Sequence, residues 1–310
     1  MRVTGLARFL PHLWINLACV FWAGNMTVGR ALRGHIGPGL IVTLRGAMSL
    51  VLLLMLLRFL RTRKEPPLRQ DFWLLLFMAF TGVAGYQGLL YLGLRHTDAI
   101  NAALMNSAGP LVAIVMAWAV LGTTVHRVQW FGGLTSLLGI AVILSGGSVE
   151  RLLAVRFNVG DLAMLVGVFM WAGYSVAGRI VMRERSVLSV TTITSSMALL
   201  MVTPWGLWEA QTAAPVLTPA VWAGLAYMAV FVGVGALLAW NYGVKAMGPA
   251  EAMAFMNMTP LYAVLLSTWI LHEPMRGPQM AGAVLVVGGS LLAALGPQWS
   301  GKRTPGSATT

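Results

Sequence analysis

Polar and aromatic side chains recur inside long apolar runs of this 310-residue chain. Such side chains are costly in lipid, and they usually face the interior of a helix bundle. For any single hydroxyl or amide, a hydrogen bond to a neighbouring helix is the alternative interpretation. As a set, these side chains predict a neutral, polar and partly aromatic binding chamber. The members are Trp22, Asn25, Tyr86, Gln87, Tyr91, Asn106, Ser107, Trp171, Tyr174, Ser175, Trp240, Asn241, Tyr242, Asn257 and Thr259.

Arg45 is a further candidate for substrate binding. It stands seven residues into the apolar run 38–60, about 10 Å from its start at the rise of an α-helix. A guanidinium at that depth could bind a substrate carboxylate through two parallel hydrogen bonds. It could instead reach the membrane surface or join span ends by bonding to carbonyls. Arg30 and Arg179 stand at matching run ends and are expected to anchor them.

Covalent and metal chemistry are not expected. The chain has no His-x-x-x-His pattern, and its five histidines lie at or beyond the ends of the apolar runs, at positions 12, 35, 96, 126 and 272. The single cysteine, Cys19, lies inside the first run and is expected to be a small core residue. An enzyme would need a nucleophile, a carboxylate pair or a metal cluster, and a channel would need a ring of like residues or a carbonyl filter. The sequence therefore predicts no enzyme, no channel, no metal and no cofactor.

Composition places the candidate chamber in a membrane. Of all residues 58% are hydrophobic and 10% are charged, against roughly 45–50% and about 25% in soluble domains. A bilayer crossing needs about 20 apolar residues, and ten such runs predict an all-α membrane protein with ten transmembrane helices. The predicted spans are 10–32, 38–60, 72–94, 98–121, 127–147, 159–182, 187–208, 220–243, 250–271 and 277–296. The net charge of +12 is spread between the runs, so no nucleic-acid partner is expected.

An internal repeat divides the chain into two halves. "WAGNMTVGR" at 22–30 returns as "WAGYSVAGR" at 171–179, and an offset of 150 then pairs further residues without a gap, among them Pro110 with Pro260. The halves are residues 10–147 and 159–297, each with five predicted spans, and the tail 298–310 is expected to be disordered. Because five is odd, the second half must enter the membrane from the opposite side, which predicts two inverted five-helix repeats.

Pro110 and Pro260 interrupt equivalent spans. Each lacks a backbone N–H and so frees a carbonyl one turn earlier, on Asn106 and Met256. A freed carbonyl in lipid must meet another helix, a side chain or a watery cavity. We expect kinked fourth and ninth spans that line a central cavity and act in gating, with simple packing as the alternative.

The distribution of Lys and Arg residues predicts the orientation of the chain, and glycines predict which spans form a scaffold. With the N-terminus inside, 13 Lys and Arg residues fall on the inner side and five on the outer, which predicts cytoplasmic termini. The outer five are Arg33, Arg95, Arg151, Arg156 and Arg276. Spans 127–147 and 277–296 carry glycines at intervals that allow close helix packing. These two spans are expected to form a scaffold or a homo-oligomer contact.

The ensemble of motifs resembles the drug/metabolite transporter superfamily, EamA type. It consists of "FWAGN", "TLRGAMSLVLLLML", "AALMNSAGPLVAIVMAWAVLG", "NMTPLYAVLLSTWILHEP" and "AGAVLVVGGSLLA" in this order. The family often carries a Gly-Glu pair after both proline helices, whereas this chain has Gly122-Thr123 and His272-Glu273. The resemblance implies an exporter of amino acids or related metabolites in the cytoplasmic (inner) membrane.

The acidic residues bear on energy coupling. All nine lie in loops or within a turn of the predicted span ends, whereas proton-coupled pumps generally carry an ionisable relay inside the membrane. We therefore expect facilitative transport of neutral amino-acid-like solutes by alternating access. The alternatives are a lipid, sugar-phosphate or drug translocator of the same superfamily, or a proton-coupled antiporter in which Asp161 or Glu273 titrates.

Overall fold

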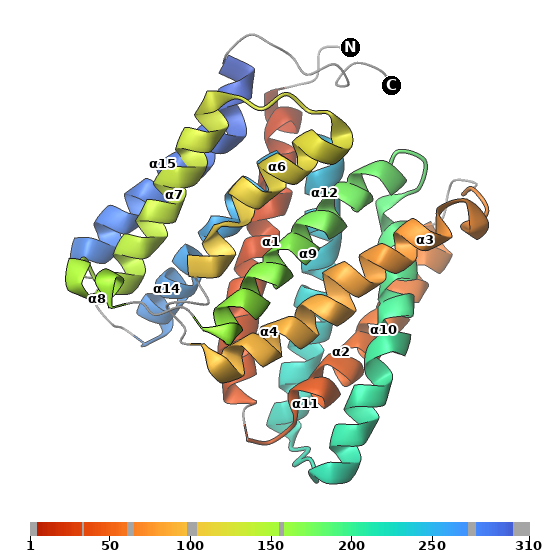
Figure 1. Ribbon diagram of the computed structural model, residues 1–310. Helices are drawn as coiled ribbons and strands as arrows, with labels where there is room; N and C mark the ends of the chain where they lie inside the picture. Colours follow the sequence, from red (N-terminus) through yellow and green to blue (C-terminus); the bar gives the residue numbers. More distant parts are fainter. Residues whose placement is uncertain are drawn as a thin grey trace.

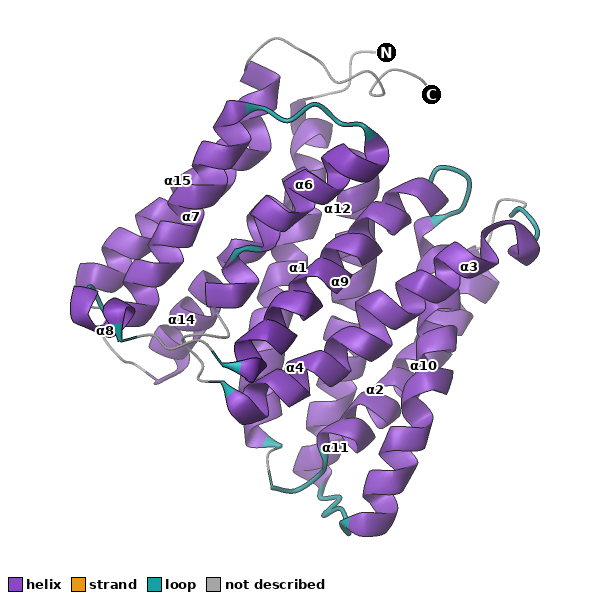
Figure 2. Cartoon of the chain, viewed as in Figure 1, coloured by secondary structure: helices purple, strands orange, loops and turns teal. Residues whose placement is uncertain are grey.

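The computed structural model describes residues 5–32, 34–60, 65–97, 104–154, 158–271 and 277–299. All regular secondary structure in these ranges is helical, and the helices form one bundle in which α1 begins and α15 ends at the same end (Figures 1 and 2). In chain order they are α1 (Gly5–Ala31), α2 (Pro38–Leu60), α3 (Leu68–Met78), η1 (Ala79–Ala84), α4 (Gly85–His96), α6 (Gly109–Leu121), α7 (Arg127–Ser145), α8 (Val149–Leu153), α9 (Val159–Val181), α10 (Val187–Thr212), α11 (Pro219–Tyr227), η2 (Met228–Ala236), α12 (Leu237–Met247), α13 (Pro249–Ala254), η3 (Phe255–Asn257), α14 (Met258–Leu271) and α15 (Gly277–Trp299).

Local sequence explains where several helices begin and end. Asn158 caps α9 by accepting from the Asp161 backbone N–H at 3.1 Å, and the Asp161 carboxylate accepts from the Asn158 N–H at 2.8 Å. This reciprocal pair satisfies two N–H groups that have no partner within the helix. Gly122 and Gly146 end α6 and α7 with φ of 65° and 63°, a left-handed conformation that glycine adopts without a Cβ penalty.

Seven described helices are long and apolar enough to cross a membrane. They correspond to the predicted second, third, fifth, sixth, seventh, eighth and tenth spans. The predicted fourth span falls partly outside the described residues, and the ninth is divided into α13, η3 and α14. The number of ten spans therefore stays a prediction.

The first helix begins earlier than the apolar run suggested. Because α1 starts at Gly5, His12 lies inside the helix, and its ring packs 5.5 Å from that of Phe255. His12 nevertheless lies at the start of the apolar run, so the expectation that it stands at a span end stays a prediction. The apolar run begins only at about Leu10, and the helix extends past it toward the N-terminus.

Two spans contain π-helical segments at equivalent places. η1 joins α3 to α4, and η2 joins α11 to α12, so each span is continuous but locally widened. In η1 the Gly85 N–H donates to the Phe80 carbonyl, five residues back. π segments inside α-helices often occur at functional sites, and no sequence pattern had indicated these two.

Glycines bring α7 and α15 into close contact. A Cβ added to Gly132 would lie 2.6 Å from the Gly289 carbonyl oxygen, and one added to Gly139 would lie 2.7 Å from that of Gly282. The two helices lie side by side in Figure 1. The stripe of small residues is thus covered within the chain. A homo-oligomer contact through these helices would have to use their outer faces, where Val284 is exposed.

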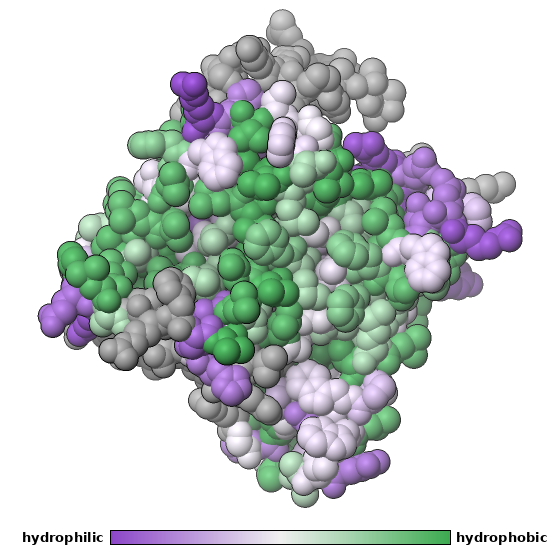
Figure 3. Space-filling view, in the orientation of Figure 1, coloured by the Kyte–Doolittle hydropathy of each residue, from purple (hydrophilic) through white to green (hydrophobic). Residues whose placement is uncertain are grey.

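The outer surface is largely apolar between polar ends. Hydrophobic side chains cover the middle of the face in Figure 3, and hydrophilic ones gather toward the ends of the bundle. Trp73 and Trp118 are exposed at the end where α3 begins, and Trp208 and Trp222 at the end where α11 begins. Tryptophan at both ends of an apolar band is typical of the two membrane interfaces.

Candidate functional site

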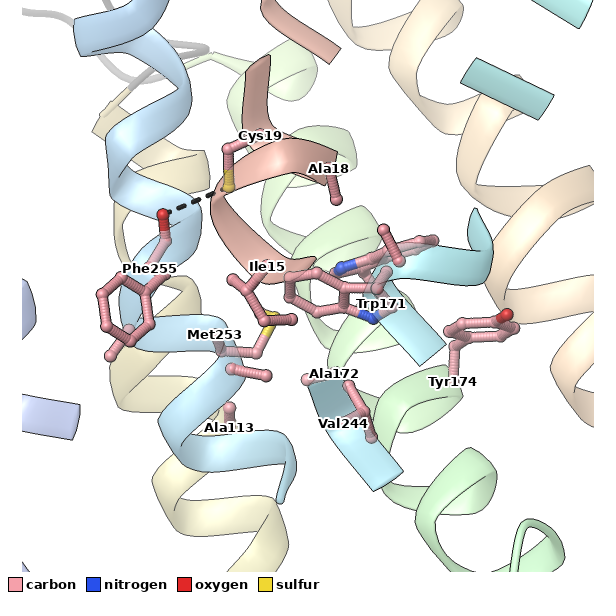
Figure 4. Close-up of a cluster of buried hydrophobic side chains, with 14 of the residues drawn as sticks. Ile15, Ala18, Cys19, Ala113, Trp171, Ala172, Tyr174, Val244, Met253 and Phe255 are labelled. Atoms are coloured by element: carbon pink, nitrogen blue, oxygen red, sulfur yellow. Dashed lines mark hydrogen bonds between the residues drawn. The ribbon is translucent and has the colours of Figure 1, made fainter. Parts of the chain in front are cut away.

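Five aromatic side chains from α1, α4, α9 and α12 meet in the core. Trp171 lies at their centre, with ring centroids 5.4 Å from Trp22, 5.6 Å from Tyr86, 5.0 Å from Tyr174 and 5.5 Å from Trp240. The Trp22 and Trp240 rings are also 5.4 Å apart. Figure 4 shows Trp171 and Tyr174 within this part of the core. We name these five residues the aromatic cluster, and all five are among the candidates that the sequence indicated.

Glycine in a neighbouring span makes room for the cluster. Gly82 in η1 lies so close to the Tyr174 ring that any Cβ would overlap it. The π segment and the glycine therefore let the third span approach α9 at the depth of Tyr174. Tyr86 is the second residue after η1, and its ring contacts that of Trp171 from the same span.

A polar network supports the second-half side of the cluster. Asn241 Nδ2 donates to Tyr174 OH at 2.8 Å and to Thr191 Oγ1 at 2.9 Å, which joins α9, α10 and α12. Trp240 Nε1 donates to Ser175 Oγ at 3.2 Å. These bonds correspond to the alternative interpretation, a hydrogen bond to a neighbouring helix, and substrate binding by Asn241 stays a prediction. Thr191 was missed by the sequence reasoning, although it stands in a Thr- and Ser-rich stretch of α10 that could have indicated it.

Two buried polar atoms near the cluster have no hydrogen-bond partner in the part of the chain that the structure describes. They are Nε1 of Trp171 and Oδ1 of Asn25. Asn25 lies one turn beyond Trp22 on α1. No group of three His, Cys, Asp or Glu residues within the described ranges could hold a metal ion.

Other candidates lie in a second polar group, at the helix breaks. Asn257 Nδ2 donates to the Ser107 carbonyl at 3.3 Å and to Ser136 Oγ at 2.9 Å, and Ser136 Oγ lies 3.3 Å from Ser290 Oγ. Asn106 stands beside Ser107 and is half-buried. Asn257 and Ser107 therefore join the broken helices to the α7–α15 pair.

The helices are interrupted at both Pro110 and Pro260. The chain forms a turn at Ala108 and α6 then begins with Pro110 in its first turn, while the 3-10 segment η3 precedes Pro260 in α14. At the second break, Cys19 Sγ donates to the Phe255 carbonyl at 3.3 Å (Figure 4). This carbonyl belongs to the residue before Met256, whose carbonyl Pro260 was expected to free, so the expectation for Met256 stays a prediction.

The remaining candidates are dispersed. Arg45 is half-buried on α2, where its carbonyl accepts from Ser49 Oγ at 2.7 Å. Gln87 is half-buried on α4, and Tyr242 is exposed and packs beside Trp14. The side chain of Tyr91 lies outside the described part. Arg45, Gln87 and Tyr242 thus lie on three different helices, α2, α4 and α12.

An ion cluster closes one end of the bundle. Arg185 is 2% exposed, and its guanidinium donates from Nε to Asp71 at 2.9 Å and from Nη2 to the Pro67 carbonyl at 3.0 Å. Nη1 lies 3.8 Å from Glu65, whose carboxylate also accepts from the Ser186 N–H at 3.1 Å. We name Arg185, Asp71 and Glu65 the ion cluster. It joins the two halves of the chain.

Hydrogen bonds between the halves also close the opposite end. Glu209 Oε2 accepts from the Leu40 backbone N–H at 3.0 Å in the first turn of α2. The Val216 N–H donates to the His35 carbonyl at 2.7 Å, and Thr97 donates to Asp161. A carboxylate at a helix N-terminus is favoured by the helix dipole. The sequence reasoning had placed these acids near span ends but had assigned them no partners.

Comparison with known proteins identifies the family. The model of the EamA-like transporter family matches the chain twice, over residues 9–145 and 158–295. The chain belongs to the EamA-like transporter family. The two matches correspond closely to the halves that the internal repeat had indicated, and membership makes the apolar bundle a membrane protein.

Several relatives within curated proteins are also transporters. The uncharacterized transporters YyaM and YetK of Bacillus subtilis are 26% and 25% identical, with coverage of 88% and 91% of this chain and 90% and 91% of theirs. The uncharacterized inner membrane transporter YedA of Escherichia coli K12 is 27% identical, with 79% and 78% covered. A crystal structure 19% identical in sequence superposes with a TM-score of 0.76 over 94% of this chain and 99% of that one, which shows a shared fold.

Proposed function

We propose that this EamA-family transporter carries neutral, amino-acid-like solutes across the cytoplasmic membrane by alternating access, and that the solute binds at the aromatic cluster. The observation that carries the proposal is the cluster itself. It combines five aromatic rings with buried amide and hydroxyl groups, at a meeting point of helices from both halves. Polar groups in a membrane interior mark substrate pathways by default.

An inverted repeat is supported by contacts between equivalent residues. Trp22 and Trp171 occupy matching positions of the repeat and touch. Ser107 and Asn257, which are 150 residues apart, are hydrogen-bonded. The glycine contacts of α7 and α15 are also reciprocal, because the equivalents of Gly132 and Gly289 are Gly282 and Gly139. Contacts of this kind are expected around a two-fold axis that relates two halves of opposite orientation.

Alternating access is supported by closure at both ends. The ion cluster joins the halves at one end, and the Glu209 and Asp161 contacts join them at the other. Between them, Trp171, Tyr174, Trp240 and Asn241 are each no more than 4% exposed. A solute can reach these groups only if one end opens, so opening the ends in turn would carry it across.

The charges favour a neutral solute. Every described acid lies outside a helix or within about a turn of a helix end, so none stands beside the cluster as a counter-charge for a cation. A phosphate carrier would be expected to present more than one buried cation near its site. Arg185 is buried but is paired with acids at the end of the bundle, and Arg179 donates to the Val244 carbonyl. Both observations favour amino-acid-like solutes over sugar phosphates.

Uptake and counterflow in proteoliposomes test the proposal. Labelled neutral amino acids, nucleosides, sugar phosphates and quaternary cations should be compared at equal pH on both sides with an ionophore present. We expect counterflow of neutral amino acids without a pH gradient. Flux that begins only when a pH gradient is imposed would instead identify a proton-coupled antiporter, and flux of phosphates alone would overturn the solute class.

A further inference from the structure

The polar groups around the aromatic cluster differ in whether they already have partners. Trp240 Nε1 and the Asn241 amide are bonded within the protein, and so is the Tyr174 hydroxyl. Trp171 Nε1 and Asn25 Oδ1 are buried without a hydrogen-bond partner among the described residues. We propose that these two atoms are the recognition points for the solute: Trp171 donates to its carboxylate, and Asn25 accepts from its ammonium group. This assignment rests on the proposed function.

An unpartnered buried donor or acceptor is costly, because it has lost its hydrogen bonds to water and gained none. Native proteins leave few such atoms, and each one calls for an explanation such as a ligand. The internal repeat allows Asn25 to be compared with its equivalent residue in the second half. Tyr174 stands at the position equivalent to Asn25, and its hydroxyl is bonded to Asn241. Of these two equivalent residues, Asn25 is the one whose side-chain acceptor has no hydrogen-bond partner among the described residues.

The two atoms come from different halves of the chain. Trp171 belongs to α9, whereas Asn25 belongs to α1, one turn beyond the Trp22 ring that lies 5.4 Å from Trp171. A solute that bonded to both atoms would join α1 to α9. Binding would therefore favour the conformation in which the halves are closed around the cluster, which links recognition to the transport cycle.

The chemistry of the two atoms defines the solute class. An indole N–H only donates and an amide oxygen only accepts, so the pair matches a molecule with a separate acceptor and donor. Both protein groups are uncharged, so a zwitterion adds no net charge to the site. The surrounding rings of Trp22, Tyr86 and Trp240 would contact its apolar side chain. An α-amino acid with an apolar or aromatic side chain meets these conditions.

The decisive variant removes the N–H but keeps the ring. Trp171→3-benzothienylalanine replaces the indole nitrogen by sulfur in a bicyclic system of the same shape. Binding of L-phenylalanine to the purified full chain would be compared with binding of its methyl ester, which keeps the ammonium group but lacks the carboxylate. We expect about tenfold weaker binding of the acid and a smaller loss for the ester, because its neutral carbonyl is a weaker acceptor than a carboxylate. The same replacement at Trp240, whose N–H is bonded to Ser175, should leave the ratio of acid to ester affinity unchanged.

Asn25→Leu tests the other recognition point. It should weaken binding of L-phenylalanine and of the ester by the same factor, because both retain the ammonium group, so that the ratio of acid to ester affinity stays unchanged. An unaltered acid-to-ester ratio in the Trp171 variant would overturn the assignment while leaving the protein an amino-acid transporter. Absence of binding of the acid to the wild-type protein would overturn the proposed solute class, and this assignment with it.

Discussion

Replacing Arg185 should destabilise the bundle strongly and by an amount that depends on Asp71. Arg185 is 2% exposed, and Arg185→Met would leave the carboxylates of Asp71 and Glu65 without their cation. Removing one partner of a buried ion pair typically costs about 3–5 kcal/mol. Because the Asp71 side chain is 19% exposed and can regain some hydration, we expect the lower end, about 3 kcal/mol.

A double-mutant cycle separates the ion pair from simple loss of packing. Unfolding by SDS in mixed micelles, followed by circular dichroism, would be measured for the wild type, Arg185→Met, Asp71→Asn and the double variant. The double variant should be less destabilised than the sum of the single ones by at least about 1 kcal/mol, because its neutral amide no longer needs a cation. Arg183→Met, at an exposed neighbouring position, should stay within about 0.5 kcal/mol of wild type.

Two results would refute this reasoning. Additive effects of the two single substitutions would mean that Arg185 and Asp71 do not stabilise each other. If Arg185→Met lowered the free energy of unfolding as little as Arg183→Met, the buried guanidinium would not stabilise this end of the bundle.

Three further predictions follow from the packing, the breaks and the orientation. Gly139→Leu should lower the SDS midpoint, because its Cβ would lie 2.7 Å from a backbone oxygen of α15, whereas Gly288→Leu, which meets no atom within 4 Å, should match wild type. Pro260→Ala should lower uptake while the amount of inserted protein stays constant, because the helix is interrupted just before this proline. Unchanged uptake would mean that the kink serves only helix packing. In a cysteine-free chain on intact cells, Ser300→Cys should resist an impermeant maleimide and Gln211→Cys should react, and the reverse pattern would contradict cytoplasmic termini.

The aromatic cluster could be predicted from the sequence because two signals agreed. Trp22 and Trp171 share both their depth in an apolar run and their place in the repeat. Tyr86, Tyr174 and Trp240 were selected by depth alone, since polar or aromatic groups near span centres tend to face inward. The structure brings all five together.

The position of a residue within an apolar run did not distinguish the polar residues beside the aromatic cluster from those at the helix breaks. Asn257 and Asn241 look alike in the sequence, yet Asn257 lies at the helix breaks and Asn241 beside the cluster. The difference depends on which helices are neighbours, and that is fixed by long-range packing. The partners of Arg185 escaped prediction for the same reason, because Asp71 is 114 residues away in the chain. The π segments have no pattern in the sequence that distinguishes them from an ordinary α-helix.

The π segment η1 has a consequence for how this protein can vary. A π turn holds one residue more than an α-helical turn, and one residue corresponds to about 100° of rotation around a helix axis. Deleting a single residue between Ala79 and Ala84 would remove the widening and keep a span of nearly full length. The rest of the span would keep its orientation, because the π turn loses only the residue that it holds in excess, so Tyr86 would still face Trp171. A single deletion within α4 itself would instead turn the residues after it by about 100° around the helix axis, so η1 is the part of this span that tolerates a change in length.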